Sequence, residues 1–250
     1  MRTSNPALNA NVFQQFEADR FEITGGAATM TVAGTSVKTG ILLALAVITA
    51  GFTWNLGLSG GQAAMGWMIG GAIAGLVLAL ITVFKPTWSP ITAPAYALAE
   101  GLFLGGISAT YSSLYDGIVV QAVLLTFGTL CTMLMAYGFG LVRATEKFKA
   151  GILAATGGIC LVYLVSFAMS FFGASIPYIH GSGMIGIGFS LFVVVIAALN
   201  LVLDFDFIER GAQTNAPKYM EWYGAFGLMV TLVWLYLEIL RLLSKLNRRD

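Results

Sequence analysis

Long apolar runs alternate with short polar turns along most of the chain. Seven runs are long enough to cross about 30 Å of hydrocarbon as helices, at a rise of roughly 1.5 Å per residue. Prolines, glycines and charged residues mark the connections. The seven runs cover approximately residues 38–58, 62–84, 92–114, 118–142, 150–172, 183–208 and 222–243. The pattern predicts an all-α polytopic membrane protein, a bundle of seven transmembrane helices at 38–245 between a polar tail (1–37) and a basic end (246–250).

Composition strengthens this interpretation. Of the 250 residues, 58% are hydrophobic and only 10% are charged, whereas about a quarter of a soluble domain is charged. The first 37 residues are polar and mixed, without an early apolar core, so they do not resemble a cleavable signal. The formal charge is +1 and no basic patch stands out, which argues against a nucleic-acid partner. The expected surroundings are a lipid bilayer.

Small residues recur at four-residue spacing within the predicted helices. This spacing lets two helix backbones approach closely in lipid, where packing drives association. The pairs are Gly66 and Gly70, Gly71 and Gly75, and Gly101 and Gly105. We expect them to serve general helix packing in a compact bundle.

The distribution of Lys and Arg predicts the orientation in the membrane. With seven crossings, the N-terminal side collects Arg2, Arg20, Lys38, Lys85, Arg143, Lys147, Lys149, Arg210 and Lys218. The opposite side has only the C-terminal Arg241, Lys245, Arg248 and Arg249. By the positive-inside rule, the N-terminus is expected to be cytoplasmic. The basic C-terminal end argues the other way and leaves open a bent or incomplete seventh crossing.

The interiors of the predicted spans contain acids but no Lys or Arg. The acids are Glu100, Asp204, Asp206 and Glu238. An ionised side chain in hydrocarbon costs a few kcal/mol even on lenient scales, so such residues are usually paired, protonated or facing water. Neutrality would then come from a proton shared between carboxyls or from a bound ion. A pair of this kind suits pH sensing, and it suits a hard cation such as calcium.

Local alternatives exist for some of these acids. Glu238 stands three residues before Arg241 and could form an intrahelical ion pair. Asp206 and Glu209 lie close to the polar loop, where they could be solvated residues that mark an exit to water. Asp204 and Glu100 lie deeper, at comparable depths, and are the stronger candidates for function.

Three short motifs resemble the Bax inhibitor family of transmembrane proteins. They are DFDFIERG at 204–211, WLYLEILRLLSKL at 234–246 and the opening SNPAL at 4–8, which with the polar tail is similar to a bacterial branch. The resemblance implies a seven-helix bundle with a central last helix, in the bacterial plasma (inner) membrane. It also implies a pH-sensitive calcium leak gated by acids on the last two helices. Carried over to this chain, those acids are Asp204 and Glu238, which become candidate calcium ligands.

Two features depart from the family pattern. Asp-Phe-Asp at 204–206 replaces the usual Asp-Thr-Gln. Moreover, Asp204 and Glu238 would be symmetric about residue 221, whereas the polar loop between their helices centres near 215. This difference corresponds to about twelve residues, or roughly 18 Å along a helix. Depth favours Glu100 as the partner of Asp204 instead, so the membership of an acidic cluster of Glu100, Asp204 and Glu238 stays open.

Several classes of protein are excluded by what the spans lack. A retinal-type receptor needs a Lys in a span, and the span interiors have none. The only histidine, His180, falls in a loop and is expected to be solvated, and Cys131 and Cys160 are expected to be small core residues. Asp204 and Asp206 lack the Gly-x-Gly-Asp context of an intramembrane aspartyl protease, and no base is available for a nucleophile. We expect no catalytic residue and no cofactor apart from calcium as a bound or transported ion.

Two hypotheses about function follow. The first is a proton-regulated cation channel, in which carboxylates hold the bundle closed while they carry a proton. The second, which the resemblance to bacterial family members suggests, is a non-catalytic regulatory protein that interacts with a membrane protease or another membrane partner, with the polar tail as the docking element. A secondary transporter is a weaker third hypothesis, since matching halves with broken helices are not evident.

Overall fold

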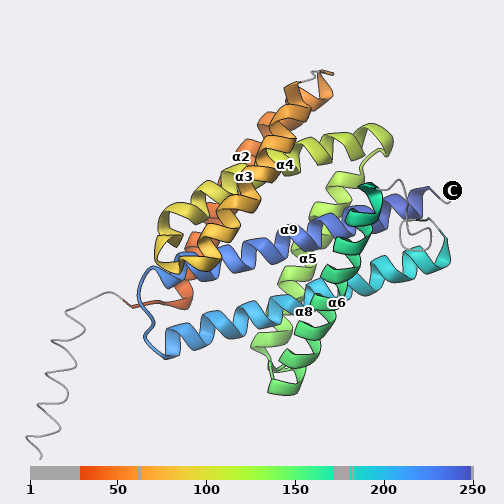
Figure 1. Cartoon of the computed structure of the whole chain (residues 1–250). Coiled ribbons are helices and arrows are strands. Elements are labelled where there is room, and N and C mark those ends of the chain that lie inside the picture. Colours follow the sequence, from red (N-terminus) through yellow and green to blue (C-terminus); the bar gives the residue numbers. More distant parts are fainter. Residues whose placement is uncertain (1–28, 61–62, 172–180, 182, 249–250) are drawn as a thin grey trace, which may run out of the picture.

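The computed structural model describes residues 29–60, 63–171, 181 and 183–248. This part of the chain is almost entirely helical, without a β-sheet (Figure 1). The α-helices are α2 (Val32–Leu58), α3 (Ala63–Phe84), α4 (Ser89–Leu114), α5 (Ile118–Gly138), α6 (Glu146–Phe171), α8 (Met184–Gln213) and α9 (Met220–Asn247), with a short 3-10 helix, η2 (Pro86–Trp88), before α4. They lie over the seven predicted runs. The predicted polar tail up to residue 28 and His180 lie outside the described residues.

The largest difference at a helix start concerns α2. The helix begins at Val32, so it includes residues 32–37, which the hydropathy pattern assigns to the polar tail. Thr31 caps this end, because its hydroxyl accepts a 2.9 Å hydrogen bond from the Gly34 backbone N–H. The cap lets weakly apolar residues enter the helix, and it extends α2 beyond the hydrocarbon-length run.

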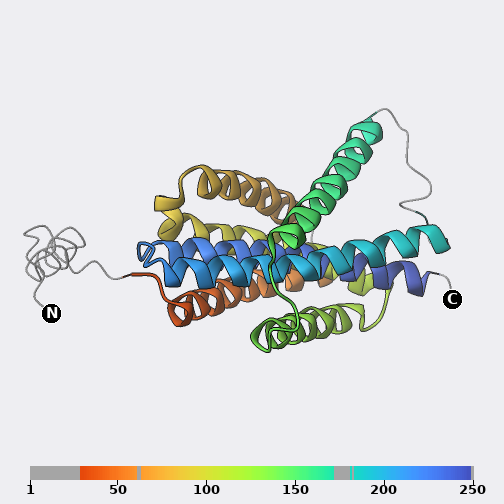
Figure 2. The same ribbon diagram turned by 90° about the horizontal axis from the view of Figure 1, so that it is seen from below.

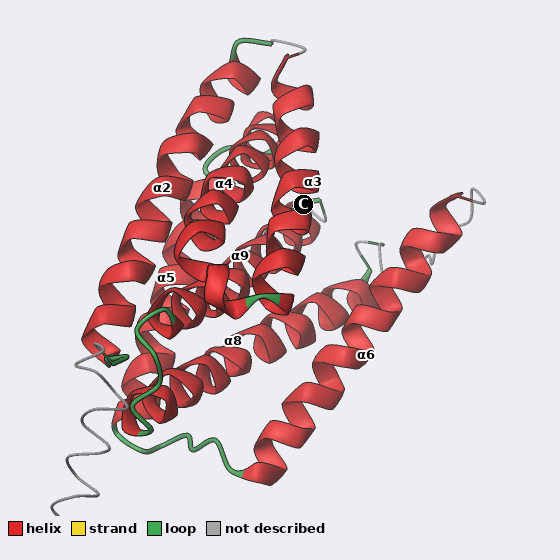
Figure 3. Ribbon diagram, turned by 60° about the vertical axis from the view of Figure 1, so that its left-hand side comes forward, coloured by secondary structure: helices red, strands yellow, loops and turns green. Residues whose placement is uncertain are grey.

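Six of the helices are long and apolar enough to cross a membrane by length and composition. They are α2, α3, α5, α6, α8 and α9. The other long helix, α4, contains Glu100, an internal Pro94 and many small or hydroxyl residues. Because α4 packs chiefly against α2 and α3, protein rather than lipid covers much of its surface (Figure 3).

Helix α9 has the most enclosed position in the bundle. It packs against α2, α4, α5 and α8, and 56% of its apolar window is buried, against 11% for α6. Helix α8 runs alongside α9, whereas α6 leaves the bundle obliquely (Figure 2). The last helix therefore forms the centre of the described structure, and α6 is its most loosely packed helix.

Glycines bring α4 close to both of its neighbours. A Cβ placed on Gly105 would lie 2.7 Å from the Cα of Ala50 on α2, and a Cβ on Gly71 would lie 2.6 Å from the backbone oxygen of Ala99. The predicted packing role is confirmed for the pairs at 71 and 75 and at 101 and 105. Gly66 and Gly70 differ, because no atom lies within 4 Å of the space that a Cβ would occupy there.

The register of the α8–α9 hairpin follows from its cross-helix contacts. A Cβ on Gly224 would lie 3.2 Å from Ile208, and Lys245 Nζ donates a 3.0 Å hydrogen bond to the Gly186 carbonyl. The first pair is symmetric about residue 216, and the second about a point between residues 215 and 216. Asn215 adopts the left-handed conformation of this turn, with φ of 52°. The predicted turn centre near 215 is confirmed.

The expectation for the two cysteines is wrong in one respect. Cys131 and Cys160 are free thiols, but both are exposed instead of buried in the core. An apolar run in a membrane helix does not distinguish a protein-facing position from a lipid-facing one, because both surroundings favour apolar residues.

Candidate functional site

Asp204 points into the seam between α8 and α9. Its Oδ1 would lie 3.9 Å from a Cβ placed on Gly227, and Thr231 lies one turn further along α9, where its hydroxyl donates to the Gly227 carbonyl over 3.3 Å. The other oxygen, Oδ2, is buried without a hydrogen-bond partner, and among the described residues no other buried side-chain oxygen or nitrogen is in this situation.

A carboxyl in these surroundings has to be neutral or compensated. An ionised group buried without a partner costs several kcal/mol, so buried acids usually hold a proton or bind a positive charge. None of the ion pairs within the described part of the chain involves Asp204. The free Oδ2 can therefore carry a proton, or it can accept a hydrogen bond from water or bind a cation.

Glu238 is buried in a different way. Only 1% of the residue is exposed, but Arg241 Nη1 donates to Oε1 over 2.9 Å, and the Tyr163 hydroxyl on α6 donates to the same oxygen over 2.9 Å. The Arg241 guanidinium lies over the Tyr163 ring, 4.8 Å from its centroid. The intrahelical ion pair considered for Glu238 is present, so its charge is compensated.

Glu100 is buried on α4 and faces α3. Its Oε2 lies 2.7 Å from the position of a Cβ on Gly75, which would need the carboxylate to move. No hydrogen bond or ion pair of the Glu100 side chain occurs with any described residue. Glu100 is therefore a second buried acid without a protein counter-charge.

The structure does not bring Glu100, Asp204 and Glu238 into one cluster. Asp204 faces Gly227, so Glu238 lies eleven residues further along α9, or roughly 16 Å. Glu100 lies between α4 and α3, whereas α8 packs mainly against α9. In this conformation, Asp204 pairs with neither acid, and the described residues contain no group of three or more His, Cys, Asp or Glu able to hold a metal ion.

Asp206 and Glu209 lie near the end of α8 and have close partners. Asp206 accepts a 2.7 Å contact from Lys149 Nζ on α6 and a 3.0 Å contact from Arg210 Nε. Glu209 accepts a hydrogen bond from the Tyr137 hydroxyl on α5 and another, of 3.2 Å, from Gln213. Asp206 is thus ion-paired and largely covered, with 16% of its side chain exposed, while Glu209 is exposed.

Comparison with known protein families gives a match over nearly the whole chain. The model of the family described as "Bax inhibitor 1 like" matches residues 5–248. The chain belongs to the Bax inhibitor 1 like family. Neither a curated protein nor a solved structure matches it. The resemblance of the DFDFIERG and WLYLEILRLLSKL segments is thereby confirmed, and family membership together with six apolar helices makes the chain an integral membrane protein.

This Bax inhibitor 1 like chain holds a further buried acid that the sequence analysis missed. Glu221, in the first turn of α9, is fully buried. It accepts hydrogen bonds from the Thr31 backbone N–H and hydroxyl, both of 2.9 Å, and forms ion pairs with Lys38 and, over 2.7 Å, with Lys218. These contacts clamp the start of α2 to the start of α9.

Sequence offered one signal for this clamp. Lys218 stands three residues before Glu221, a spacing that permits a local ion pair. The contacts with Lys38 and Thr31 join residues more than 180 positions apart, which no local pattern could reveal. The buried Lys245 was missed for the same reason, because its 2.8 Å hydrogen bond reaches Ser190 on α8.

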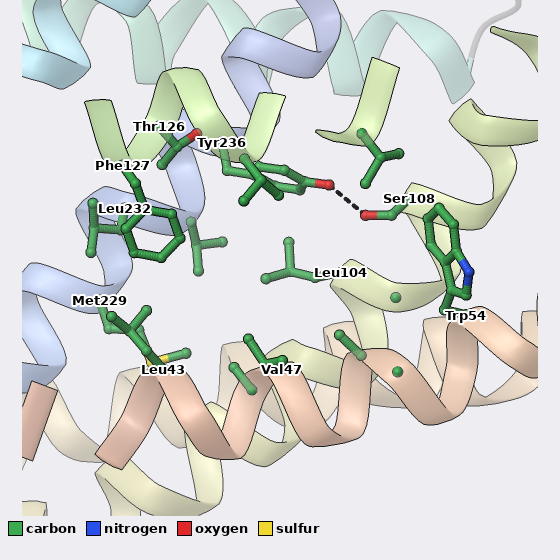
Figure 4. A pocket seen from close by; sticks show the side chains of 17 residues that line it. Leu43, Val47, Trp54, Leu104, Ser108, Thr126, Phe127, Met229, Leu232 and Tyr236 are labelled. Carbon is green, nitrogen blue, oxygen red and sulfur yellow. Dashed lines mark hydrogen bonds between the residues drawn. The ribbon is translucent and has the colours of Figure 1, made fainter. Parts of the chain in front are cut away.

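An apolar pocket of about 300 Å³ lies beside the centre of α9 (Figure 4). Leu43, Val47, Phe127 and Leu232 are among its lining residues, and a 2.7 Å hydrogen bond joins the Ser108 and Tyr236 hydroxyls at its edge. No acid lines this pocket. In the family member described here, the buried acids and the apolar pocket are separate features of the bundle.

Proposed function

We propose that the protein is a pH-sensitive cation channel, a leak pathway for calcium, controlled by a proton on Asp204. The observation that supports this proposal is the Asp204 carboxyl, whose Oδ1 lies near Gly227 and whose buried Oδ2 has no hydrogen-bond partner among the described residues. Because this carboxyl has to bind a proton, a water molecule or a cation, its occupancy depends on both the pH and the cation concentration.

The proposed closed state has a proton on Asp204. The neutral carboxyl lets α8 and α9 stay in contact. Loss of the proton leaves a negative charge in the seam, where no residue that the structure describes supplies a cation. Water or a cation then has to enter, and the two helices separate locally to admit it. Flux is therefore expected to rise as the pH rises.

The other acids have secondary roles in this proposal. Glu100, also without a counter-charge, is the second proton-binding candidate. Glu238 contributes to gating through its contact with Tyr163 of α6, and it becomes a calcium ligand only if Arg241 moves away. Asp206 and Glu209 form the exit to the cytoplasm, where oxygen ligands suit a hard cation.

The proposed topology has seven crossings, α4 included, and a cytoplasmic N-terminus in the bacterial plasma membrane. The starts of α2, α4 and α9 lie at the same end of the bundle. Just before α2, the Met30 N–H donates to the Ala216 carbonyl, and at the start of α4 the Ser89 hydroxyl donates to the Tyr219 carbonyl, just before α9. The bases Lys38, Lys85, Arg143, Lys149, Arg210 and Lys218 belong to this end, which the positive-inside rule assigns to the cytoplasm.

A non-catalytic interaction protein is the second candidate. Gly66 and Gly70 on α3 favour it, because their small faces have no neighbour within the described structure and could receive a helix of a membrane partner, such as a protease subunit. We propose no enzymatic activity in either case.

Calcium flux into proteoliposomes between pH 5 and pH 8 separates the two candidates. The native chain is compared with empty liposomes and with the Glu100→Gln and Glu238→Gln variants. A channel gives flux that rises with pH, and a shifted midpoint in one variant identifies the second gating acid. Flux equal to that of empty liposomes at every pH, with folded protein present, contradicts the channel and favours the interaction protein.

A further inference from the structure

A large cavity at the proposed cytoplasmic end has a lining that changes from polar to apolar with depth. Its volume is about 790 Å³, and it lies between the start of α2, the end of α5, the 139–145 connection and the end of α8. Tyr137 lines its outer part, whereas Leu134 and Leu130 follow one and two turns deeper on the same helix. Pockets that enclose an organic ligand typically have about 300–1,000 Å³, so this cavity can hold one.

Arg143 gives the outer part of the cavity an available cation. It lines the cavity, yet its guanidinium forms no ion pair or hydrogen bond with any residue that the structure describes. The connection that carries it is ordered by the end of α5, because the Leu141 and Val142 N–H groups both donate to the Ala136 carbonyl, over 2.9 and 3.2 Å. A guanidinium presents a fork of donors that matches the oxygens of a phosphate.

Glu209 adds a carboxylate to the same lining. The Tyr137 hydroxyl and Gln213 each donate to one of its oxygens, so the carboxylate is fixed in place while retaining acceptor positions. Asp206 also lines the cavity, but Lys149 and Arg210 already compensate its charge. The available charges are therefore one cation and one anion, which is the pattern of a zwitterionic headgroup.

The inner part of the cavity suits hydrocarbon. Leu130, Leu134, Phe205 and Leu228 line it, and no charged side chain does so at that depth. Leu134 is 52% exposed. A ligand that combines a charged head with alkyl chains fits both halves.

We propose that this cavity binds a phosphatidylethanolamine-type phospholipid of the cytoplasmic leaflet. Arg143 binds the phosphate, Glu209 accepts hydrogen bonds from the primary ammonium group, and the first carbons of an acyl chain lie against Leu134 and Leu130. The bound lipid would join α2, α5 and α8 at this end of the bundle. This binding site does not depend on the channel proposal, because binding is measured without ion flux.

Native mass spectrometry of the full chain in detergent, titrated with phosphatidylethanolamine or phosphatidylcholine, tests the site. Arg143→Gln is expected to weaken phosphatidylethanolamine binding about tenfold, the loss of roughly one charge-assisted interaction. Glu209→Gln is expected to remove the preference over phosphatidylcholine, whose ammonium has no N–H to donate. The matched control is Lys147→Gln, because Lys147 is an exposed base of the same region that does not line the cavity.

The source of the headgroup is tested by competition. Soluble glycerophosphoethanolamine should not displace the lipid at equal concentration, because it lacks the chains that contact the inner half. Displacement at equal concentration would overturn the assignment to a lipid and indicate a site for a free phosphoester. Equal affinities of the native chain, Arg143→Gln and Lys147→Gln would overturn the site itself.

Discussion

Buried acids of this protein differ in how their charge is met. Glu221 and Glu238 have bases within contact distance, whereas Asp204 and Glu100 have none among the residues described. The acids with a nearby base contribute to stability through contacts between helices, since Glu221 contacts Lys38 of α2 and Glu238 contacts Tyr163 of α6. Removing one partner would leave an unpaired buried charge. The uncompensated acids are the ones that protons or cations can influence. Residue type alone does not separate these roles. Spacing indicates a local partner for Glu238, which is Arg241, and for Glu221, which is Lys218.

The clamp around Glu221 predicts a large loss of stability in Glu221→Gln. Lys38 and Lys218 would lose their counter-charge, at a cost of about 3 kcal/mol. Thermal unfolding of the purified chain in detergent measures the effect as a lower Tm. Glu146→Gln is the control, because its side chain is 84% exposed and such surface pairs contribute about 1 kcal/mol or less. Similar Tm values for the two variants would show that the clamp contributes little.

At the scale of helices, the sequence predicts the elements well and their contacts only in part. The seven runs and the turn centre near 215 follow from hydropathy and turn residues, which act locally. The inward faces do not, because lipid and protein favour the same apolar residues. The three glycine pairs show this, since their spacing is identical but only Gly66 and Gly70 face away from the bundle.

Substitution of two of these glycines measures the difference directly. Gly105→Ala places a Cβ against the backbone of Ala50 and is expected to destabilise the chain by about 1–3 kcal/mol, which lowers Tm by several degrees. In Gly66→Ala the new Cβ meets open space, so Tm should be unchanged or slightly raised. Alanine has a higher helix propensity than glycine, and this gain is the same in the two variants. A lower Tm in Gly66→Ala than in Gly105→Ala would contradict the assigned faces.

Polar contacts at heptad spacing hold the loosely packed α6. Lys149 contacts Asp206, Thr156 accepts a 2.9 Å hydrogen bond from Asn200, and Tyr163 donates to Glu238. All three positions share one face of α6, and little apolar burial supports them.

Tyr163→Phe should therefore loosen α6 more than its small change in volume suggests. Loss of about 1 kcal/mol of hydrogen bonding predicts roughly fivefold faster exchange of α6 amide hydrogens. Hydrogen exchange in nanodiscs measures this, with Ser170→Ala as the control, because Ser170 donates within its own helix, to the Phe167 carbonyl. Unchanged exchange in Tyr163→Phe would mean that apolar packing holds α6.

The whole molecule combines a central helix, a hairpin seam and a set of charged contacts at one end. The sequence predicts the family and the membrane location, because the apolar runs recur along most of the chain and the family match covers residues 5–248. The contacts that join distant segments, such as Lys38 with Glu221, do not follow from it. Asp204 lies in the central seam between α8 and α9, where no described residue forms an ion pair with it.

The most direct test compares the pH profile of calcium flux in Asp204→Asn with that in Asp116→Asn. Asn cannot lose a proton in this range, so Asp204→Asn is expected to stay closed, with low flux from pH 5 to pH 8. Asp116 is exposed between α4 and α5, so Asp116→Asn should retain the native rise of flux with pH. A native pH profile in folded Asp204→Asn would contradict the central claim.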